Sequence, residues 1–322
     1  MPETPKSPER SQYETLEAWL QTELRPQYES RIEFLNQNGL LEPFSESDSI
    51  GIVGADGRKY KLPKLREVEA EIRANPELWE KKLSQGLTEL ELTPFALPLK
   101  LLAQRASEAI LRHYDPDPNK TKLFATKKNP NDPNEKLVPL ELDANQPLFL
   151  WDKLTNADTD GSLVYYPTSF DPNNHGGKTK AEVIANTQVF PGWILSFQEA
   201  NPNIPAEGQG KTKNGRKQLE ANQTPNEYLK TIQANPQYQN EQGQIPEQWL
   251  SQFLKHLEKT NQVVDDWQGN SKASYLVGSY VPTSGVVPVA YWNRGYRQAY
   301  LGGFGPRLRY GNFGVRVLTR VN

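Results

Sequence analysis

Residues 306–318 read PRLRYGNFGVRVL and fit the pattern P-x-x-R-x-x-x-F-G-V-R-V-L. From Phe313 to Val317, every second residue is apolar, which is the period of a strand with one buried face. We therefore expect these residues to pack inward or to form the last strand of the chain. The two arginines inside the pattern, Arg309 and Arg316, are expected to hydrogen-bond carbonyl groups in the sheet.

Charge is distributed unevenly around this stretch. Residues 273–322 contain no Asp, Glu or Lys, although the whole chain carries 39 acidic residues. The same window contains six arginines and six tyrosines, and it includes the run GGFG at 302–305. Tyr offers large contacts at low entropic cost, Gly gives loops freedom and Arg supplies anchoring donors, so this composition is similar to that of a paratope. A Gly-rich sheet with aromatic cross-strand pairs would have the same composition.

Composition divides the chain into four segments. Residues 1–12 are rich in Pro and charge, and we expect them to be flexible. Residues 13–114 are expected to form a mainly helical module. Residues 115–146, rich in Pro, Asn, Asp and Lys, predict a linker or a long hairpin. Residues 147–322 would form the domain that ends in the pattern above, and the mixture of helical and strand-like runs predicts the α+β class.

Turn and breaker residues define the elements of the N-terminal module. Apolar spacing from Leu16 to Leu35 predicts one or two amphipathic helices broken near Pro26. Asp56-Gly57 predicts the turn of a β-hairpin. Two short helices are expected on either side of Pro76, and a longer helix should end near Tyr114.

Helix starts are also marked in the C-terminal half. Thr179-x-x-Glu182 and Thr224-x-x-Glu227 are capping boxes, which predict helices near 180–187 and 225–234. A further amphipathic helix is expected over 246–260, with Pro246 in its first turn.

Several functional classes are excluded by composition. The chain of 322 residues contains no cysteine, so disulfides, Cys-ligated metals and thiol nucleophiles are excluded. No stretch approaches 18 apolar residues, so we expect no membrane insertion. The N-terminus has no apolar run of the secretory type, which predicts a cytoplasmic location. A net charge of −2 argues against nucleic acid as the partner.

Two acidic motifs have alternative interpretations. Asn156, Asp158 and Asp160 precede Gly161 in the manner of a calcium loop, but position 167, where such a loop needs a bidentate Glu, is Pro. An Asp- and Gly-rich turn is favoured there, with calcium as the alternative cofactor. The adjacent acids Asp265-Asp266 could form an acid–base pair, but a capping or loop role is favoured.

The pattern at 306–318 resembles the closing strands of formylglycine-generating-enzyme-like proteins, a branch of the C-type lectin fold. More narrowly, the window is similar to the variable region of proteins diversified by diversity-generating retroelements. In that family, adenines in Asn-type template codons are randomised, which permits Tyr, Gly, Leu, Phe, Arg, Ser, Val and Asn but excludes Lys, Glu, Gln, Met and Trp. The resemblance implies a C-type-lectin-like ligand-binding domain at 147–322 with a variable region at 280–313.

This resemblance separates fixed from exchangeable positions. Within 273–322, only Trp292 and Gln298 are of the excluded types. The implied fixed scaffold consists of Trp292, Gln298, Pro306, Arg309, Phe313, Gly314 and Arg316. The implied exposed binding face consists of Tyr291, Gly295, Tyr296, Tyr300, Leu301, Phe304, Leu308 and Tyr310.

The implied function is recognition without catalysis, with an unidentified protein or glycan as the ligand. The alternative is a formylglycine-generating-enzyme-like protein that acts on a small substrate without Cys chemistry. The enzymes of that group use a Cys pair with copper, and the related sulfoxide synthases use a His triad with iron. This chain has no Cys, and its three histidines, His113, His175 and His256, lack the spacing of the triad.

Overall fold

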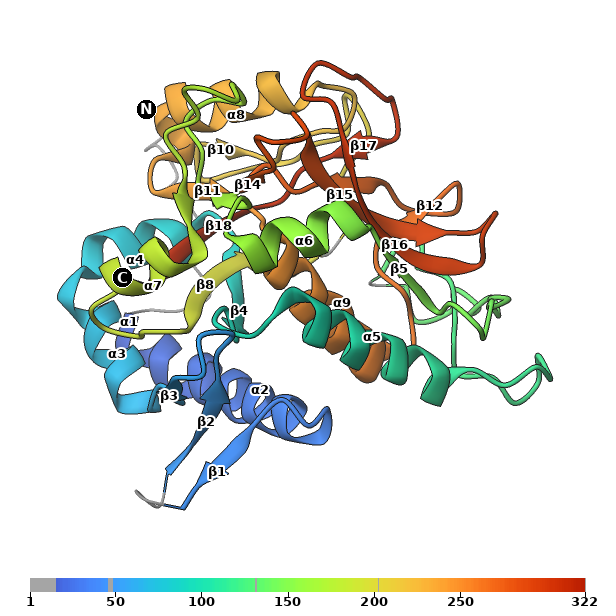
Figure 1. The fold of residues 1–322 in the computed structure, drawn as a ribbon, viewed down its shortest axis with the longest axis horizontal. Helices are drawn as coiled ribbons and strands as arrows, with labels where there is room; N and C mark the ends of the chain where they lie inside the picture. Colours follow the sequence, from blue (N-terminus) through green and yellow to red (C-terminus); the bar gives the residue numbers. More distant parts are fainter. Residues whose placement is uncertain (1–15, 46–48, 131, 202, 322) are drawn as a thin grey trace, which may run out of the picture.

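The computed structural model describes residues 16–45, 49–130, 132–201 and 203–321 (Figure 1). Helices and several β-sheets alternate along the chain, which confirms the α+β class. The flexible segment predicted for residues 1–12 lies outside the described residues.

The helices fall in all parts of the described chain. They are α1 (Leu16–Trp19), the π-helical turn η1 (Leu20–Leu24), α2 (Arg25–Gln37), α3 (Leu65–Ala74), α4 (Pro76–Ser84), α5 (Leu99–His113), α6 (Asp152–Asp160), α7 (Lys180–Asn186), α8 (Pro225–Ala234), the 3-10 turn η2 (Pro236–Tyr238) and α9 (Pro246–Thr260).

The strands of the described residues form five sheets. Two of them are small: β1 (Glu42–Phe44), β2 (Ser49–Val53) and β3 (Lys59–Lys61) in one, and β9 (Thr212–Lys213) with β10 (Arg216–Lys217) in the other. A third has the order β14 (Ser279–Tyr280), β6 (Val164–Tyr165), β7 (Lys178–Thr179). The four-stranded sheet has the order β11 (Glu241–Gly243), β18 (Val317–Val321), β8 (Ile194–Glu199), β4 (Leu87–Thr93). The largest has the order β17 (Phe313–Gly314), β13 (Ala273–Tyr275), β15 (Val287–Asn293), β16 (Gln298–Phe304), β5 (Leu148–Leu150), and β12 (Asp266–Trp267) also pairs with β15.

Most of the local signals are confirmed. The hairpin at Asp56-Gly57 joins β2 to β3, with Gly57 at φ +74°. Thr179 and Thr224 cap α7 and α8 through their side chains, as the capping boxes predict. Helices α3 and α4 meet at Pro76, and α5 ends at His113.

The break predicted near Pro26 is wrong. The chain remains helical from Leu16 to Gln37, and the π-helical turn η1 lies directly before the residues Arg25 and Pro26 that open α2. Proline lacks the N–H that an α-helix needs, and its ring collides with the carbonyl four residues earlier. A wider π turn at that place relieves this collision, so the helix continues.

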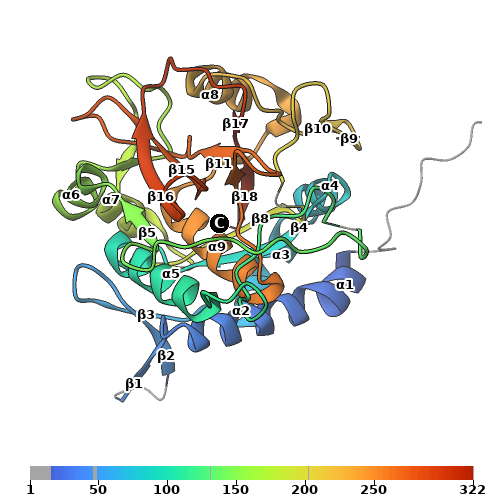
Figure 2. The same ribbon diagram turned by 90° about the vertical axis from the view of Figure 1, so that its right-hand side faces the viewer.

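Helix α9 is more buried than an amphipathic pattern predicts. All residues from Pro246 to Leu254 are buried, including the polar Glu247, Gln248, Ser251 and Gln252. Figure 2 shows the reason: α9 lies in the middle of the molecule, between α2 and α5 on one side and the C-terminal strands on the other. The helix is therefore the central support for the sheets around it.

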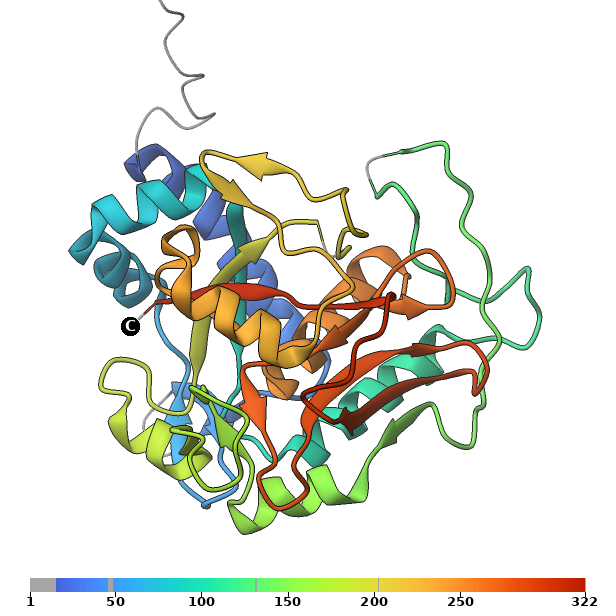
Figure 3. The same cartoon turned by 90° about the horizontal axis from the view of Figure 1, so that it is seen from above.

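The N-terminal segment shares its core with the C-terminal strands. Strand β4, a run for which the sequence predicted no element, pairs antiparallel with β8 in the same sheet as β18. One cluster of buried apolar residues runs from Leu16 to Val321. Residues 115–146, the predicted linker or hairpin, extend away from the body in Figure 3, but Leu123 and Leu140 are buried and anchor this excursion to the body.

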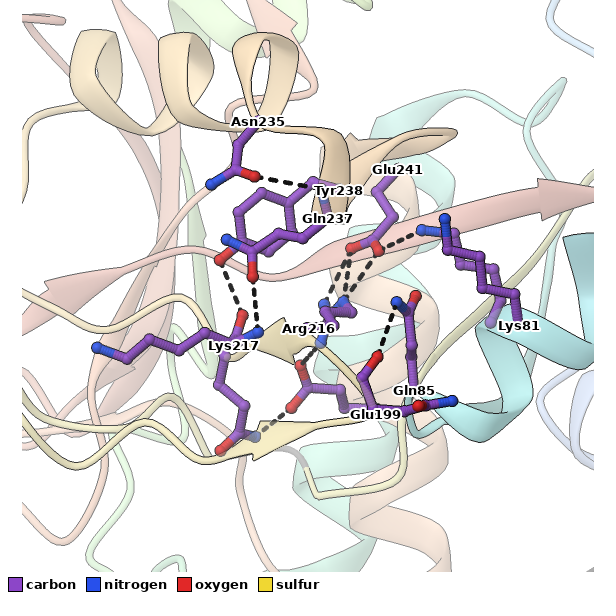
Figure 4. Close-up of polar contacts among 12 residues, drawn as sticks. Lys81, Gln85, Glu199, Arg216, Lys217, Asn235, Gln237, Tyr238 and Glu241 are labelled. Carbon is purple, nitrogen blue, oxygen red and sulfur yellow. Dashed lines mark hydrogen bonds and ion pairs between the residues drawn. The ribbon is translucent and has the colours of Figure 1, made fainter. Parts of the chain in front are cut away.

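A buried charge cluster strengthens the same connection (Figure 4). Lys82 of α4 donates to Glu241 of β11 at 2.6 Å, and both side chains are almost fully buried. Arg216 of β10 binds the same carboxylate at 2.9 Å and also reaches Glu199 of β8 at 2.7 Å. Burial lowers the pKa of Lys82, and the charge of Glu241 opposes this shift.

Replacing Glu241 tests this cluster. Glu241→Gln leaves two buried cations without their shared carboxylate, and we expect a loss of about 3–5 kcal/mol in the free energy of unfolding. The control Arg25→Gln breaks the exposed pair with Glu29 and should cost about 0.5 kcal/mol or less. Urea denaturation of both variants measures the two losses. Equal losses would show that the buried cluster does not hold α4 to the sheets.

Candidate functional site

Strands β15 and β16 place alternate residues of the C-terminal window on opposite faces of one sheet. They pair antiparallel with Tyr291 opposite Tyr300 and with Trp292 opposite Ala299. Trp292 and Ala299 belong to the main core, whereas Tyr291 and Tyr300 belong to a second, aromatic cluster on the other face. This second face is the candidate site, and we call it the aromatic face.

Stacked rings form the middle of the aromatic face. The Tyr300 ring stacks on Tyr291 on one side and on Phe149 of β5 on the other, with 4.9 Å between ring centres in each pair. A Cβ atom at Gly302 would lie only 2.5 Å from the Tyr300 ring, so this glycine lets the ring lie against the sheet. Trp267 extends the row, with its ring centre 5.2 Å from that of Tyr291.

A loop between β16 and β17 forms one margin of the aromatic face. Its residues Leu308 and Tyr310 are exposed, at 44% and 42%. Tyr310 nevertheless rests on Phe304 and Phe313, with ring centres 5.3 and 5.4 Å away. The Tyr275 hydroxyl donates to the carbonyl of Leu308, which fixes the loop over the sheet.

The β15–β16 turn forms the other margin. Asn293 Oδ1 accepts the N–H of Tyr296 at 3.0 Å, and Arg297 has a left-handed φ of +55°. Gly295 is exposed, and Tyr296, at 66% exposed, is the most exposed large apolar side chain of the described residues. A rigid turn therefore presents a tyrosine directly to solvent.

The predicted binding face is thus exposed in part. Gly295, Tyr296, Leu308 and Tyr310 are exposed, and Tyr300 and Phe304 are half-buried. Tyr291 and Leu301 correct the prediction, because they are 5% and 0% exposed. Leu301 lies on the core side of β16, as the alternation of the strand dictates once the register is fixed. Tyr291 lies on the aromatic face but is covered by the rings around it.

Beneath this face, Asp265 connects helix α9, strands β13 and β15, and the C-terminal segment that contains Arg316. It is fully buried and accepts hydrogen bonds from the Trp249 indole of α9 and the Ser274 hydroxyl of β13, both at 2.7 Å. The Arg316 guanidinium donates to both of its oxygens, at 2.5 and 2.8 Å. The backbone carbonyl of Asp265 accepts the N–H of Trp292 in β15 at 2.9 Å.

Asp266, the next residue, holds the turn of the aromatic face. Arg294 binds its carboxylate in a two-pronged geometry, at 2.7 and 2.6 Å, and Asp266 is fully buried. This contact raises the pKa of Arg294 further above its usual value, so the charge is permanent. The adjacent acids therefore anchor Arg316 of the frame and Arg294 of the turn, rather than capping a helix.

The predicted scaffold residues have different environments. Trp292, Gln298, Phe313 and Gly314 are buried, and Pro306 is half-buried. A Cβ atom on Gly314 would approach the Ile204 side chain to 2.5 Å, so no larger residue fits there without movement.

The two pattern arginines lie in different environments. Arg316 donates to the Asp265 carboxylate and to the Ser274 hydroxyl. Arg309 lies on the surface, where it pairs with Glu227 at 2.5 Å, so the carbonyl prediction is wrong for it.

The three residues of the calcium-loop interpretation lie in a helix and not in a loop. Asn156, Asp158 and Asp160 lie inside helix α6, and the turn begins only at Gly161, which has a φ of +78°. The Asp158 carboxylate pairs with Lys180 at 2.5 Å and accepts the N–H that opens α5. Across the described residues, no group of three or more His, Asp or Glu side chains is arranged to hold a metal ion.

Sequence reasoning did not identify the residues outside 273–322 that contact the arginines and tyrosines of this window. An acid-free window with six arginines must take carboxylates from elsewhere when those arginines are buried, and Asp265-Asp266 lie a few residues before it. That signal could have identified both acids as the partners of arginines in the window. Phe149 had no comparable signal, because β5 joins β16 as a parallel neighbour from far along the chain.

Comparisons of the chain with protein-family models, curated proteins and solved structures give no match. Among the helices of the described residues, none is both long and apolar enough to cross a membrane. The site must therefore be interpreted from its own geometry.

Removing the charge of Asp265 tests the connection beneath the face. Asp265→Asn keeps the shape but leaves the Arg316 guanidinium buried without a counter-charge, and we expect a loss of about 3–5 kcal/mol in unfolding free energy. The control Glu141→Gln breaks the exposed pair with Arg297 and should change stability by under about 1 kcal/mol. Chemical denaturation measures both, and a loss for Asp265→Asn as small as that of the control would contradict the assignment.

We expect His256 of α9 to make the stability of the fold depend on pH. Burial lowers its pKa to about 4, and the charges of Lys255 and Arg316 contribute to the shift. The unfolded chain takes up a proton near pH 6.5 while folded His256 stays neutral, so stability falls between pH 6.5 and pH 4 by as much as about 3 kcal/mol. His256→Gln should remove this part of the pH dependence, measured by urea denaturation at several pH values. An unchanged slope in the variant would contradict the buried neutral state.

Proposed function

We propose that this chain is a non-enzymatic recognition protein whose aromatic face is a ligand-binding surface diversified by a retroelement. The proposal includes a C-type-lectin-like fold for the C-terminal domain. It rests on the resemblance of the C-terminal pattern and on the way in which the residues of the window are distributed between interior and surface.

The distribution is the observation that carries the proposal. Of the eight residues that the resemblance makes exchangeable, four are exposed, among them Tyr296, Leu308 and Tyr310, two are half-buried and two are buried. Residues that it makes fixed lie mostly in the interior, as Trp292 and Phe313 do. A surface that must tolerate many side chains needs a frame whose stability does not depend on them, and this arrangement satisfies that need.

The chemistry of the face favours a macromolecular ligand. Tyr and Arg are the residues that dominate binding energy at protein interfaces, and the face combines tyrosines with the exposed Arg307 and Arg309 at its margin. Apolar aromatic area exposed next to charge is seldom found on proteins that have no partner. A protein or a glycan would both use such a surface, through ring stacking and hydrogen bonds from Arg.

The enzymatic alternative finds less support. Residues 273–322 contain no Cys, His, Asp or Glu, so this window supplies no thiol, imidazole or side-chain carboxylate to the face. Glu227 and Glu141, the acids that pair with Arg309 and Arg297, are bound to those cations. Binding is therefore the better account of the aromatic face.

The DNA around the coding region provides the direct test. We expect a reverse transcriptase gene nearby and a near-repeat of the 3′ coding end that differs from it only at template adenines. The differences should fall in the codons of residues 280–313. A locus without a reverse transcriptase and without a repeat would contradict diversification.

Stability measurements test the separation of frame and surface. The double variant Tyr296→Ser with Leu308→Ser replaces two exposed side chains and should lower the unfolding free energy by less than about 1 kcal/mol. The matched variant Trp292→Ser removes a buried indole from the same strand pair and should cost about 3–5 kcal/mol. Thermal and urea denaturation report both changes. A large loss for the double variant would show that these side chains belong to the frame.

A further inference from the structure

A cavity of about 470 Å³ lies away from the aromatic face, where the ends of several sheets meet α7. Tyr165 and Tyr166 line it from the end of β6, Trp193 from the start of β8, and Arg320 from the last strand, β18. Lys178 of β7 lies at its edge. A volume of this size is typical of pockets for small molecules.

The lining of this cavity is cationic and aromatic. It includes Arg320 and Lys178 but no Asp or Glu. The Arg320 guanidinium lies over the Tyr166 ring, 5.0 Å from its centre, and no carboxylate of the described residues pairs with it. Other arginines of the window, such as Arg294 and Arg316, have buried carboxylate partners. Arg320 is therefore a half-buried cation without a carboxylate partner among the described residues.

Hydrogen-bond donors around the cavity are also unpaired. Within the described part of the chain, the Trp193 indole N–H, the Tyr166 hydroxyl and Nε of Arg320 have no partner. Burial raises the pKa of the Tyr166 hydroxyl, so this group remains a donor at neutral pH. These three atoms are shielded from solvent, so they form a polar wall behind the cavity, and a bound molecule reaches them only if that wall shifts.

The backbone at Tyr166 supports a functional role. This residue has a φ of +53°, which is unfavourable for a bulky aromatic side chain. Its N–H donates to the carbonyl of Gly278 at 2.7 Å, so the neighbouring strand holds the unfavourable conformation in place. Strained residues of this kind occur where a side chain must be kept at a particular position.

We propose that this cavity binds a small organic anion, in which a carboxylate or phosphate group is attached to an apolar, planar body. Arg320 and Lys178 bind the anionic group, because a guanidinium matches either group with two parallel hydrogen bonds. The rings of Tyr166, Phe190 and Trp193 enclose the apolar body. The site is separate from the aromatic face and does not depend on the function proposed for that face.

Titration with matched probes tests the proposal on the full chain. Indole-3-acetate and phenyl phosphate are the anionic probes, and indole-3-acetamide is the neutral probe of the same shape. Isothermal calorimetry should give binding of at least one anion in the submillimolar range, with the amide at least tenfold weaker. The stronger of the two anions identifies the group that the site prefers. Equal affinity for indole-3-acetate and its amide, or no binding of either anion at millimolar concentration, would overturn the proposal.

Variants locate the binding. Arg320→Gln should weaken the anion at least tenfold, and Lys178→Gln, an exposed side chain whose loss leaves the core intact, should weaken it several-fold. The control Arg307→Gln removes an exposed arginine near the aromatic face and should leave binding unchanged. Circular dichroism checks that each variant is folded, and Lys178→Gln carries the test if Arg320→Gln is not. Unchanged affinity in the folded cavity variants, or a loss only in Arg307→Gln, would overturn the assignment.

Discussion

The buried ion pair between Asp265 and Arg316 is the constraint on which the C-terminal half depends. Burying a guanidinium without a counter-charge is costly, and residues 273–322 contain no side-chain carboxylate to provide one. Asp265 supplies it from outside the window and at the same time binds Trp249 of α9 and Ser274 of β13. The closing segment, the central helix and the largest sheet are therefore held together at one buried carboxylate.

This arrangement leaves the opposite face of the sheet free for other uses. The inner side chains of β15 and β16 pack on the core, and the ion pair fixes the closing segment, so the outer tyrosines need not hold the sheet together. Loss of the Tyr300 ring would still lower the stability of the fold, because this ring is stacked between Tyr291 and Phe149. The margins differ from this middle, because Tyr296 and Leu308 project into solvent and contribute little to the core.

Sequence patterns predicted the elements whose cause is local. Capping boxes located α7 and α8, and Asp56-Gly57 located a hairpin, because each depends on hydrogen bonds or backbone angles a few residues apart. The patterns did not predict β4, whose Glu89 and Glu91 meet Lys255 on the distant helix α9. They also could not show that Tyr291 and Leu301 are buried, since the register of β16 with β15 and β5 depends on long-range pairing. The composition of the window did carry information about the site, because an acid-free, Arg-rich segment requires external carboxylates.

The most direct measurement is a saturation scan of residues 273–322 in which protease resistance reports folding of every variant. The account predicts broad tolerance at Gly295, Tyr296 and Leu308 and strong intolerance at Trp292, Gly314 and Arg316. A scan in which Arg316 accepts most residues while the exposed positions reject them would contradict it, because the frame would then be held by its surface and not by the buried ion pair.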